Sequence, residues 1–189
     1  ERNARKLFAD LIEKLGLTDN VTVVDNIDEL DGLTKDEKAT RWNKKGWYSR
    51  NTGKIVIILG NHHSKGDVIK TILHECIGHY GMRALFGTHF DTFLDNVYKN
   101  ADAEVRGRII ELAKKHGWNF RTATEEYLAS MAENENFEYP QYSSWWGKIK
   151  RLFWEMLNKL GVKVENLGVK LSDNELRYLL WRSYQNLVN

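Results

Sequence analysis

The sequence has very little cysteine and proline, and it has no long apolar run. Cys76 is the only cysteine among 189 residues, so an intramolecular disulfide and a cysteine-rich zinc module are both excluded. One proline, without Ser/Gly-rich linkers or repeats, predicts a single domain. No segment approaches the roughly 18 consecutive apolar residues that span a bilayer, and the first residues, ERNARKLF, do not resemble a signal peptide. We therefore expect a soluble, cytoplasmic protein that does not bind membranes.

A strong excess of positive charge is also missing. Lys and Arg number 28 and Asp and Glu number 26, which leaves a net charge of +2 and argues against nucleic acid as a partner. A hydrophobic content of 42% over this length is enough to bury a sizeable core. The first residue is Glu1 rather than methionine, which predicts a segment of a longer polypeptide.

The first third of the chain predicts one helix and a small sheet. Apolar residues recur at helical spacing over residues 3–15, and short strands are expected at 21–24 and 46–49. The polar stretch 31–45 between these strands is expected to be a loop or short helix and is one candidate for a lid. The apolar, β-branched run 55–59 lies between two glycines, as is typical of a buried strand.

The rest of the chain predicts helices. Ser64 and Asp67 form a capping pattern before an apolar helix, and Thr122 with Glu125 suggests another helix start. Further helices are expected at 91–98, 101–115, 123–133, 144–160 and 173–187. The predicted class is α+β, mostly helical, with one domain over 1–189 divided into an N-terminal helix and sheet (1–60), metal-binding helices (61–135) and a helical extension (136–189).

The helix after the apolar strand carries His74-Glu75-Cys76-Ile77-Gly78-His79, which is an H-E-x-x-x-H pattern. The shorter H-E-x-x-H pattern of metalloproteases places two histidines on one helical face, with the glutamate as general base. With one residue more, the histidines of a regular helix lie about 140° apart and cannot both reach one ion. We therefore expect a π-bulge, or a helix loosened at Gly78, between Cys76 and His79.

A catalytic zinc usually has three protein ligands, so a third must come from elsewhere in the chain. Glu126, Ser130 and Glu133 form a polar stripe on the helix expected at 123–133. This stripe fits either a metal cleft or the solvated side of an amphipathic helix, and periodicity alone does not choose between them.

The motif together with a later Glu-Glu-x-x-Ala resembles the gluzincin metallopeptidases, in particular dipeptidyl peptidase III, whose zinc motif also has the extra residue. The stretches HECIGHYGMRALFG, DTFLDNVY, TATEEYLASMAE and NELRYLLWRSYQNL together resemble the zincin-like metallopeptidase domain of large polyvalent proteins of bacteriophages and mobile elements. The resemblance extends from about residue 55 onward.

The resemblance implies a zincin-like fold, in which a small sheet packs on an active-site helix and a helical part follows. It implies Zn²⁺ held by His74, His79 and Glu126, with Glu75 as general base for peptide hydrolysis. It also implies a bacterial host cytoplasm, a place within a larger phage polyprotein, and a polypeptide substrate, either the parent chain or a host protein. An edge strand, supplied by the 55–59 run or a strand next to it, is expected to bind extended substrate.

The group that stabilises the transition-state oxyanion stays open. The candidates for this role or for substrate contact are Tyr80, Tyr127, Tyr178, Arg182 and His62, together with the neighbouring His63. Cys76 is expected to be a small buried side chain rather than a nucleophile. Two other functions remain: a non-catalytic helical interaction module with a structural or vestigial metal site, and a hydrolase of another amide, such as one in peptidoglycan.

Overall fold

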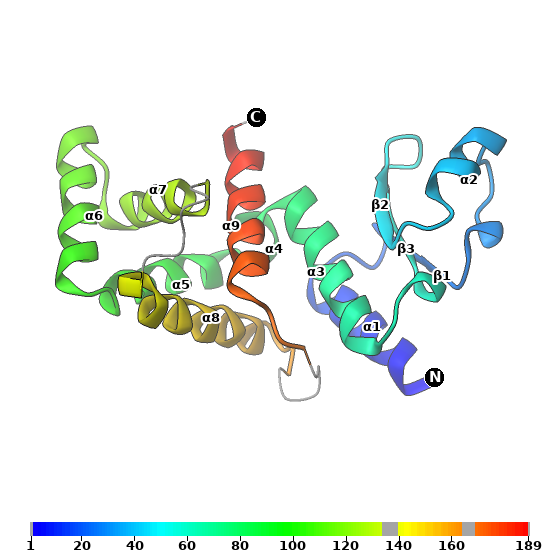
Figure 1. Ribbon diagram of the computed structural model, residues 1–189, viewed down its shortest axis with the longest axis horizontal. Coiled ribbons are helices and arrows are strands. Elements are labelled where there is room, and N and C mark those ends of the chain that lie inside the picture. Colours follow the sequence, from blue (N-terminus) through cyan, green and yellow to red (C-terminus); the bar gives the residue numbers. More distant parts are fainter. Residues whose placement is uncertain (1, 134–139, 164–168, 189) are drawn as a thin grey trace. The chain divides into compact units, whose positions relative to one another are not determined.

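A computed structural model of the chain describes residues 2–133, 140–163 and 169–188 (Figure 1). The chain divides into two compact units, the first formed by Glu1–His79 with Val162–Lys170 and the second by Tyr80–Gly161 with Leu171–Asn189. The class is α+β and mostly helical with a small sheet, as predicted. The boundaries expected at residues 60 and 135 stay a prediction.

The first unit contains a three-stranded sheet with strand order β1-β3-β2. Strand β3 is central, parallel to β1 and antiparallel to β2. The elements of this unit are α1 (Arg2–Lys14), β1 (Val21–Val24), η1 (Ile27–Glu29), α2 (Lys35–Arg41), β2 (Gly46–Ser49), β3 (Lys54–Ile58), η2 (Leu59–Asn61) and α3 (Lys65–Tyr80), whose last residue falls in the second unit.

The predicted strands at 21–24 and 46–49 are confirmed, and α2 lies within the stretch expected to be a loop or short helix. The strand expected at 55–59 is shifted by one residue, because Leu59 already begins a 3-10 turn. Gly60 is required at this turn. Its N–H donates to the Asp25 carbonyl at 2.9 Å, and a Cβ on Gly60 would lie only 2.6 Å from that oxygen.

Each face of the sheet buries a different set of apolar side chains, because successive residues of a strand point to opposite faces. Val56 and Ile58 of β3 pack with Trp47 and Ile27 in one buried cluster. Ile55 and Ile57 point to the other face and are fully buried. Helix α3 packs on this second face and buries a stripe of its own, formed by Val68, Ile69, Ile72, Leu73, Cys76 and Ile77.

Gly46 permits the close packing of α3 against strand β2. It pairs with Ile57, and a Cβ on Gly46 would lie 2.9 Å from the Val56 carbonyl oxygen and 3.1 Å from Cγ2 of Thr71 on α3. No side chain fits in that space without moving strand or helix. Three polar contacts hold the same region: Lys45 pairs with Asp67 at 2.8 Å, and the Asn61 side chain donates to the carbonyls of residues 42 and 44.

The second unit consists of helices. They are α4 (Met82–Phe86), α5 (Thr88–Lys99), α6 (Ala103–His116), α7 (Phe120–Glu133), α8 (Pro140–Leu160) and α9 (Asp173–Val188). Helix α5 packs on α7 and α8, and α7 also contacts α6 and α9. Among the described helices, none combines the length and the apolar character needed to cross a membrane.

The expected helices of this part are confirmed, and α4 is an additional short one. The expected cap of α7 is wrong. Asn119, rather than Thr122, begins this helix, because the Asn119 side-chain oxygen accepts the Thr122 N–H at 2.8 Å and so moves the start three residues earlier. Trp145 and Trp146 are buried.

Replacing Gly46 by alanine should lower the free energy of unfolding by about 1–3 kcal/mol, because the new Cβ overpacks the contact between β2 and α3. The matched control is Gly107→Ala on α6, where a Cβ meets nothing within 4 Å. This control should gain about 0.5–1 kcal/mol from helix propensity. Urea denaturation followed by circular dichroism measures both, and equal stability of G46A and wild type would contradict the role given to Gly46.

Candidate functional site

Helix α3 carries His74, Glu75 and His79 in its last two turns. The expected distortion between Cys76 and His79 is wrong, because α3 is a regular α-helix from Lys65 to Tyr80. Cys76, Ile77 and Gly78 are buried, and Cys76 and Ile77 continue the buried apolar stripe of α3, which favours regular spacing through the motif. The backbone breaks only at Gly81, whose φ of +85° ends the helix two residues after His79.

The motif side chains therefore point in different directions from α3. His74 is exposed, whereas Glu75 and His79 are half-buried. The His79 ring stacks on Tyr48 of strand β2, with ring centroids 3.8 Å apart and planes tilted by 21°. Strand β2 forms an edge of the sheet and pairs with β3 on one side. The edge strand beside the motif helix is therefore β2, the neighbour of the 55–59 run, and not the run itself.

His62 is held between the sheet and α3 by both ring nitrogens. Its Nδ1 lies 2.7 Å from the Ile58 carbonyl oxygen, to which it donates, and its Nε2 lies 2.8 Å from the Thr71 hydroxyl. Burial lowers the pKa of His62, although the nearby Asp67 carboxylate acts in the opposite direction. Through these contacts His62 joins the end of β3 to Thr71, which lies on α3 about one turn before His74. His62 therefore has a structural role.

Helix α7 carries two adjacent carboxylates with different partners. Glu125 accepts from the guanidinium of Arg83 at 2.7 Å, and Arg83 also binds Asp91 at 2.9 Å. Glu126 instead accepts from the Tyr184 hydroxyl of α9, which lies 2.8 Å from its Oε2. The stripe of Glu126, Ser130 and Glu133 is thus not uniform, because Ser130 and Glu133 are exposed and Glu126 is half-buried.

The surroundings of these two glutamates shift the pKa values of neighbouring groups. Burial raises the pKa of Glu125, and the Arg83 guanidinium offsets only part of this effect. The hydrogen bond to Glu126 raises the pKa of the Tyr184 phenol, because the phenolic proton is held by the carboxylate. Tyr184 therefore remains a hydrogen-bond donor throughout the neutral pH range.

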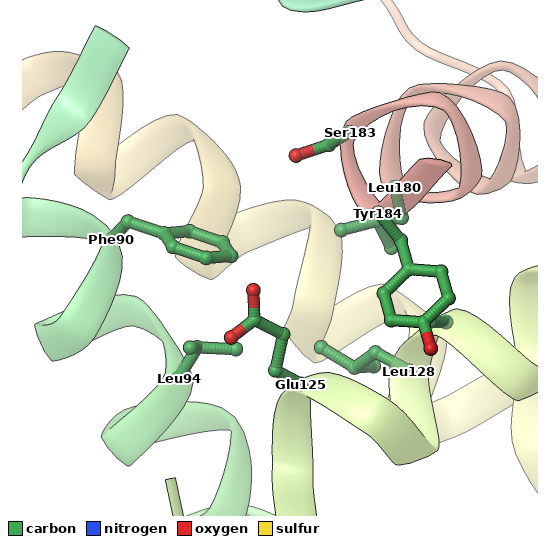
Figure 2. A pocket seen from close by; sticks show the side chains of 8 residues that line it. Phe90, Leu94, Glu125, Leu128, Leu180, Ser183 and Tyr184 are labelled. Carbon is green, nitrogen blue, oxygen red and sulfur yellow. The ribbon is translucent and has the colours of Figure 1, made fainter. Parts of the chain in front are cut away.

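A small hollow lies beside these glutamates in the second unit. The empty volume of this hollow, including the part that is open to solvent, is about 260 Å³. Figure 2 shows the Glu125 carboxylate pointing into the hollow and the Tyr184 ring forming part of its wall. Most of the lining is apolar, and it consists of Phe90, Leu94, Glu125, Leu128, Ala129, Leu180, Ser183 and Tyr184.

The other tyrosines and the arginine named as candidates lie in the second unit. Tyr127 is buried, 7% exposed, with its ring centroid 5.9 Å from that of Trp145, which suits a core residue. Tyr178 lies on α9 and is 38% exposed. Tyr80, the last residue of α3, and Arg182 on α9 are half-buried. His63 is exposed in the first unit.

The structure places His74, Glu75 and His79 in the first unit and Glu126 in the second. Within each unit, the described residues form no group of three or more His, Cys, Asp or Glu side chains gathered as a metal site. Tyr48, Arg83 and Tyr184 were missed from the sequence. Arg83 and Tyr184 had a signal there, since they lie in the HECIGHYGMRALFG and NELRYLLWRSYQNL stretches that carry part of the resemblance, whereas Tyr48 lies outside them.

Comparison with known proteins returned no matching family model, no matching curated protein and no matching solved structure.

Cys76 should be unreactive in the folded protein. Its side chain is fully buried, and burial raises the pKa of the thiol to about 12, so little thiolate is present or accessible. We expect iodoacetamide to label Cys76 at least about 10²-fold more slowly in the native state than in denaturant, because labelling requires local opening. Intact-mass spectrometry over time measures this. Equally fast labelling in both states would restore a nucleophilic role.

Proposed function

We propose that this chain is a zinc-dependent metallopeptidase with a zincin-like fold. The observation that carries the proposal is the stacking of His79 on Tyr48, which joins the end of the motif helix to the edge strand β2 within one unit. An edge strand has unpaired backbone groups that bind an extended peptide by main-chain hydrogen bonds. A polypeptide running along β2 then passes the helix that carries Glu75.

The proposed zinc ligands are His74, His79 and Glu126. Two imidazoles and a carboxylate are donors that zinc takes in catalytic sites. The hydrogen bond from Tyr184 to Glu126 also fits, since carboxylates that bind metals are themselves usually hydrogen-bonded. When bound, zinc supplies a Lewis acid that polarises a peptide carbonyl and lowers the pKa of a water molecule.

The regular geometry of α3 sets a condition on this ligand set. Histidines five residues apart lie about 140° apart around a regular helix. His79 is in the last turn, between the glycines at 78 and 81, and helix ends open more easily than helix centres. We therefore expect any change of the helix on metal binding to involve this last turn.

Glu75 is the proposed general base. It is half-buried on the same helix, one residue after His74. Its carboxylate removes the proton of the attacking water and then transfers that proton to the leaving amine. Tyr80, Tyr127, Tyr178, Arg182 and His62 remain the candidates for stabilising the oxyanion or contacting substrate. His62 and Tyr127 are the weaker ones, because the first has both ring nitrogens occupied and the second is buried.

A non-catalytic interaction module is the alternative. The regular helix through the motif favours it, because two histidines on different sides of α3 do not themselves form a metal site. If the chain is an interaction module, its metal site should be empty or should bind metal weakly, and substitution of Glu75 should change no activity.

Metal content separates the two functions. Protein purified without a histidine tag should contain about one zinc per chain by elemental mass spectrometry, and His79→Ala and Glu126→Ala should each lose it, because two remaining ligands bind zinc weakly. His116→Ala is the control, since its ring stacks on Trp118 of the second unit outside the ligand set. Absence of zinc from the wild type, even after zinc is supplied, would support the interaction module.

Replacing Glu75 by glutamine should leave zinc content unchanged and lower the rate of peptide hydrolysis by about 10²–10⁴-fold, since an amide cannot act as the base. Glu111→Gln on α6 is the matched control, because Glu111 is exposed and lies in the second unit. Cleavage of a quenched fluorescent peptide library, read by mass spectrometry, measures the rate. Full activity in E75Q would remove Glu75 from the mechanism.

A further inference from the structure

The hollow of the second unit combines an apolar wall with one carboxylate. Helices α5, α7 and α9 form it, and most of its lining side chains are aliphatic or aromatic. Figure 2 shows the Glu125 carboxylate pointing into it, with Phe90 and Leu94 of α5 on one side and Leu180 and Tyr184 of α9 on the other. Small-molecule sites have this character, since an apolar wall supplies burial and a few polar groups fix the orientation of the ligand.

Arg83 orients the Glu125 carboxylate without using all of its capacity as an acceptor. The Arg83 guanidinium donates to Oε2 of Glu125 at 2.7 Å and lies over the Phe90 ring, 5.2 Å from the ring centroid. In the part of the chain that the structure describes, the other oxygen, Oε1, accepts no hydrogen bond. Ser183, which is 4% exposed, adds a hydroxyl oxygen to the lining. That oxygen accepts one hydrogen bond, from the Met82 N–H, and has a second lone pair. The hollow therefore offers two acceptors to a donor.

The charges around the hollow favour a cation as that donor. The ion-pair network at this place contains three carboxylates and two guanidinium groups, which belong to Asp91, Asp95, Glu125, Arg83 and Arg121. The next carboxylate along α7 has the neutral Tyr184 hydroxyl as its partner. An anion would add to this excess of negative charge, whereas a cation reduces it.

We propose that the hollow binds a short aliphatic primary ammonium ion. The ammonium group donates to Glu125 and Ser183, and the alkyl chain packs on the apolar wall. The empty volume of about 260 Å³ lies below the roughly 300–1,000 Å³ of sites for drug-sized ligands, which suits a chain of about four carbons. All of these residues belong to the second unit, so the site is independent of the His74 motif and of zinc.

Titration with n-butylammonium chloride, followed by methyl NMR of the whole chain, tests the proposal. The methyl signals of Leu94, Leu128 and Leu180 should shift with a dissociation constant on the order of 1 mM, as befits so small a ligand. Potassium chloride at the same ionic strength and n-butanol should each act at least about tenfold more weakly, because the first lacks the chain and the second lacks the charge. Equal effects of either one, or shifts confined to other methyl groups, would overturn the proposal.

Two substitutions separate the charge of the hollow from its space. Glu125→Gln should weaken n-butylammonium binding about 10–100-fold, since a hydrogen bond to a charged group is lost, whereas Glu111→Gln on the exposed face of α6 should not change it. Ala129→Leu keeps the carboxylate and fills the hollow, so it should abolish binding. Circular dichroism checks that each variant is folded. Wild-type affinity in folded E125Q or A129L contradicts the site, and A129L decides alone if E125Q does not fold.

The same ammonium chemistry has two sources, a free amine or the side chain of a lysine in another polypeptide. Nα-acetyl-lysine N-methylamide carries the same four-carbon chain and ammonium group on a peptide backbone. Binding of this compound at least as tightly as n-butylammonium assigns the hollow to a lysine side chain, and weaker binding assigns it to a free amine.

Discussion

The packing of α3 on the sheet is the constraint on which the rest of the first unit depends. The helix buries a stripe formed by Ile69, Ile72, Leu73, Cys76 and Ile77, and this stripe fixes its rotation about its own axis. Once that rotation is fixed, each motif residue has one direction available. His74 faces solvent, while His79, about 140° further round, lies at the edge of the buried stripe and meets Tyr48. The packing of the buried side chains therefore decides in which direction each motif side chain of α3 points.

Local patterns predicted the elements well and their boundaries less well. The strands at 21–24 and 46–49 and the long helices follow from periodicity and capping residues. Helix α4 was missed because only five residues stand between Gly81 and Gly87, too few to show a period. The strand order β1-β3-β2 could not be predicted, since pairing depends on contacts between distant residues rather than on local pattern. The expected helix distortion was wrong for a related reason. It was predicted from the spacing of the two histidines, whereas the backbone conformation of α3 is set by the packing of its buried side chains.

The candidate site shows the same difference between features that neighbouring residues in the sequence reveal and features that depend on tertiary contacts. The H-E-x-x-x-H pattern and the pair Glu125-Glu126 are visible in the sequence because their residues are neighbours. The partner of each glutamate is not visible there, because Arg83, which pairs with Glu125, and Tyr184, which donates to Glu126, lie 42 and 58 residues away. Sequence reasoning singled out Tyr178 and Arg182 on α9, yet Tyr184 is the residue of that helix that contacts Glu126.

The end of α3 adds an electrostatic reason for a cation near the motif. A helix leaves its last four carbonyl groups without helical partners, and the aligned peptide dipoles place partial negative charge at that end. Gly81 stops α3 two residues after His79, so His79 lies in the last turn of the helix, near this partial negative charge. The break at Gly81 thus gives the motif a helix end, which a continuous helix would not have supplied.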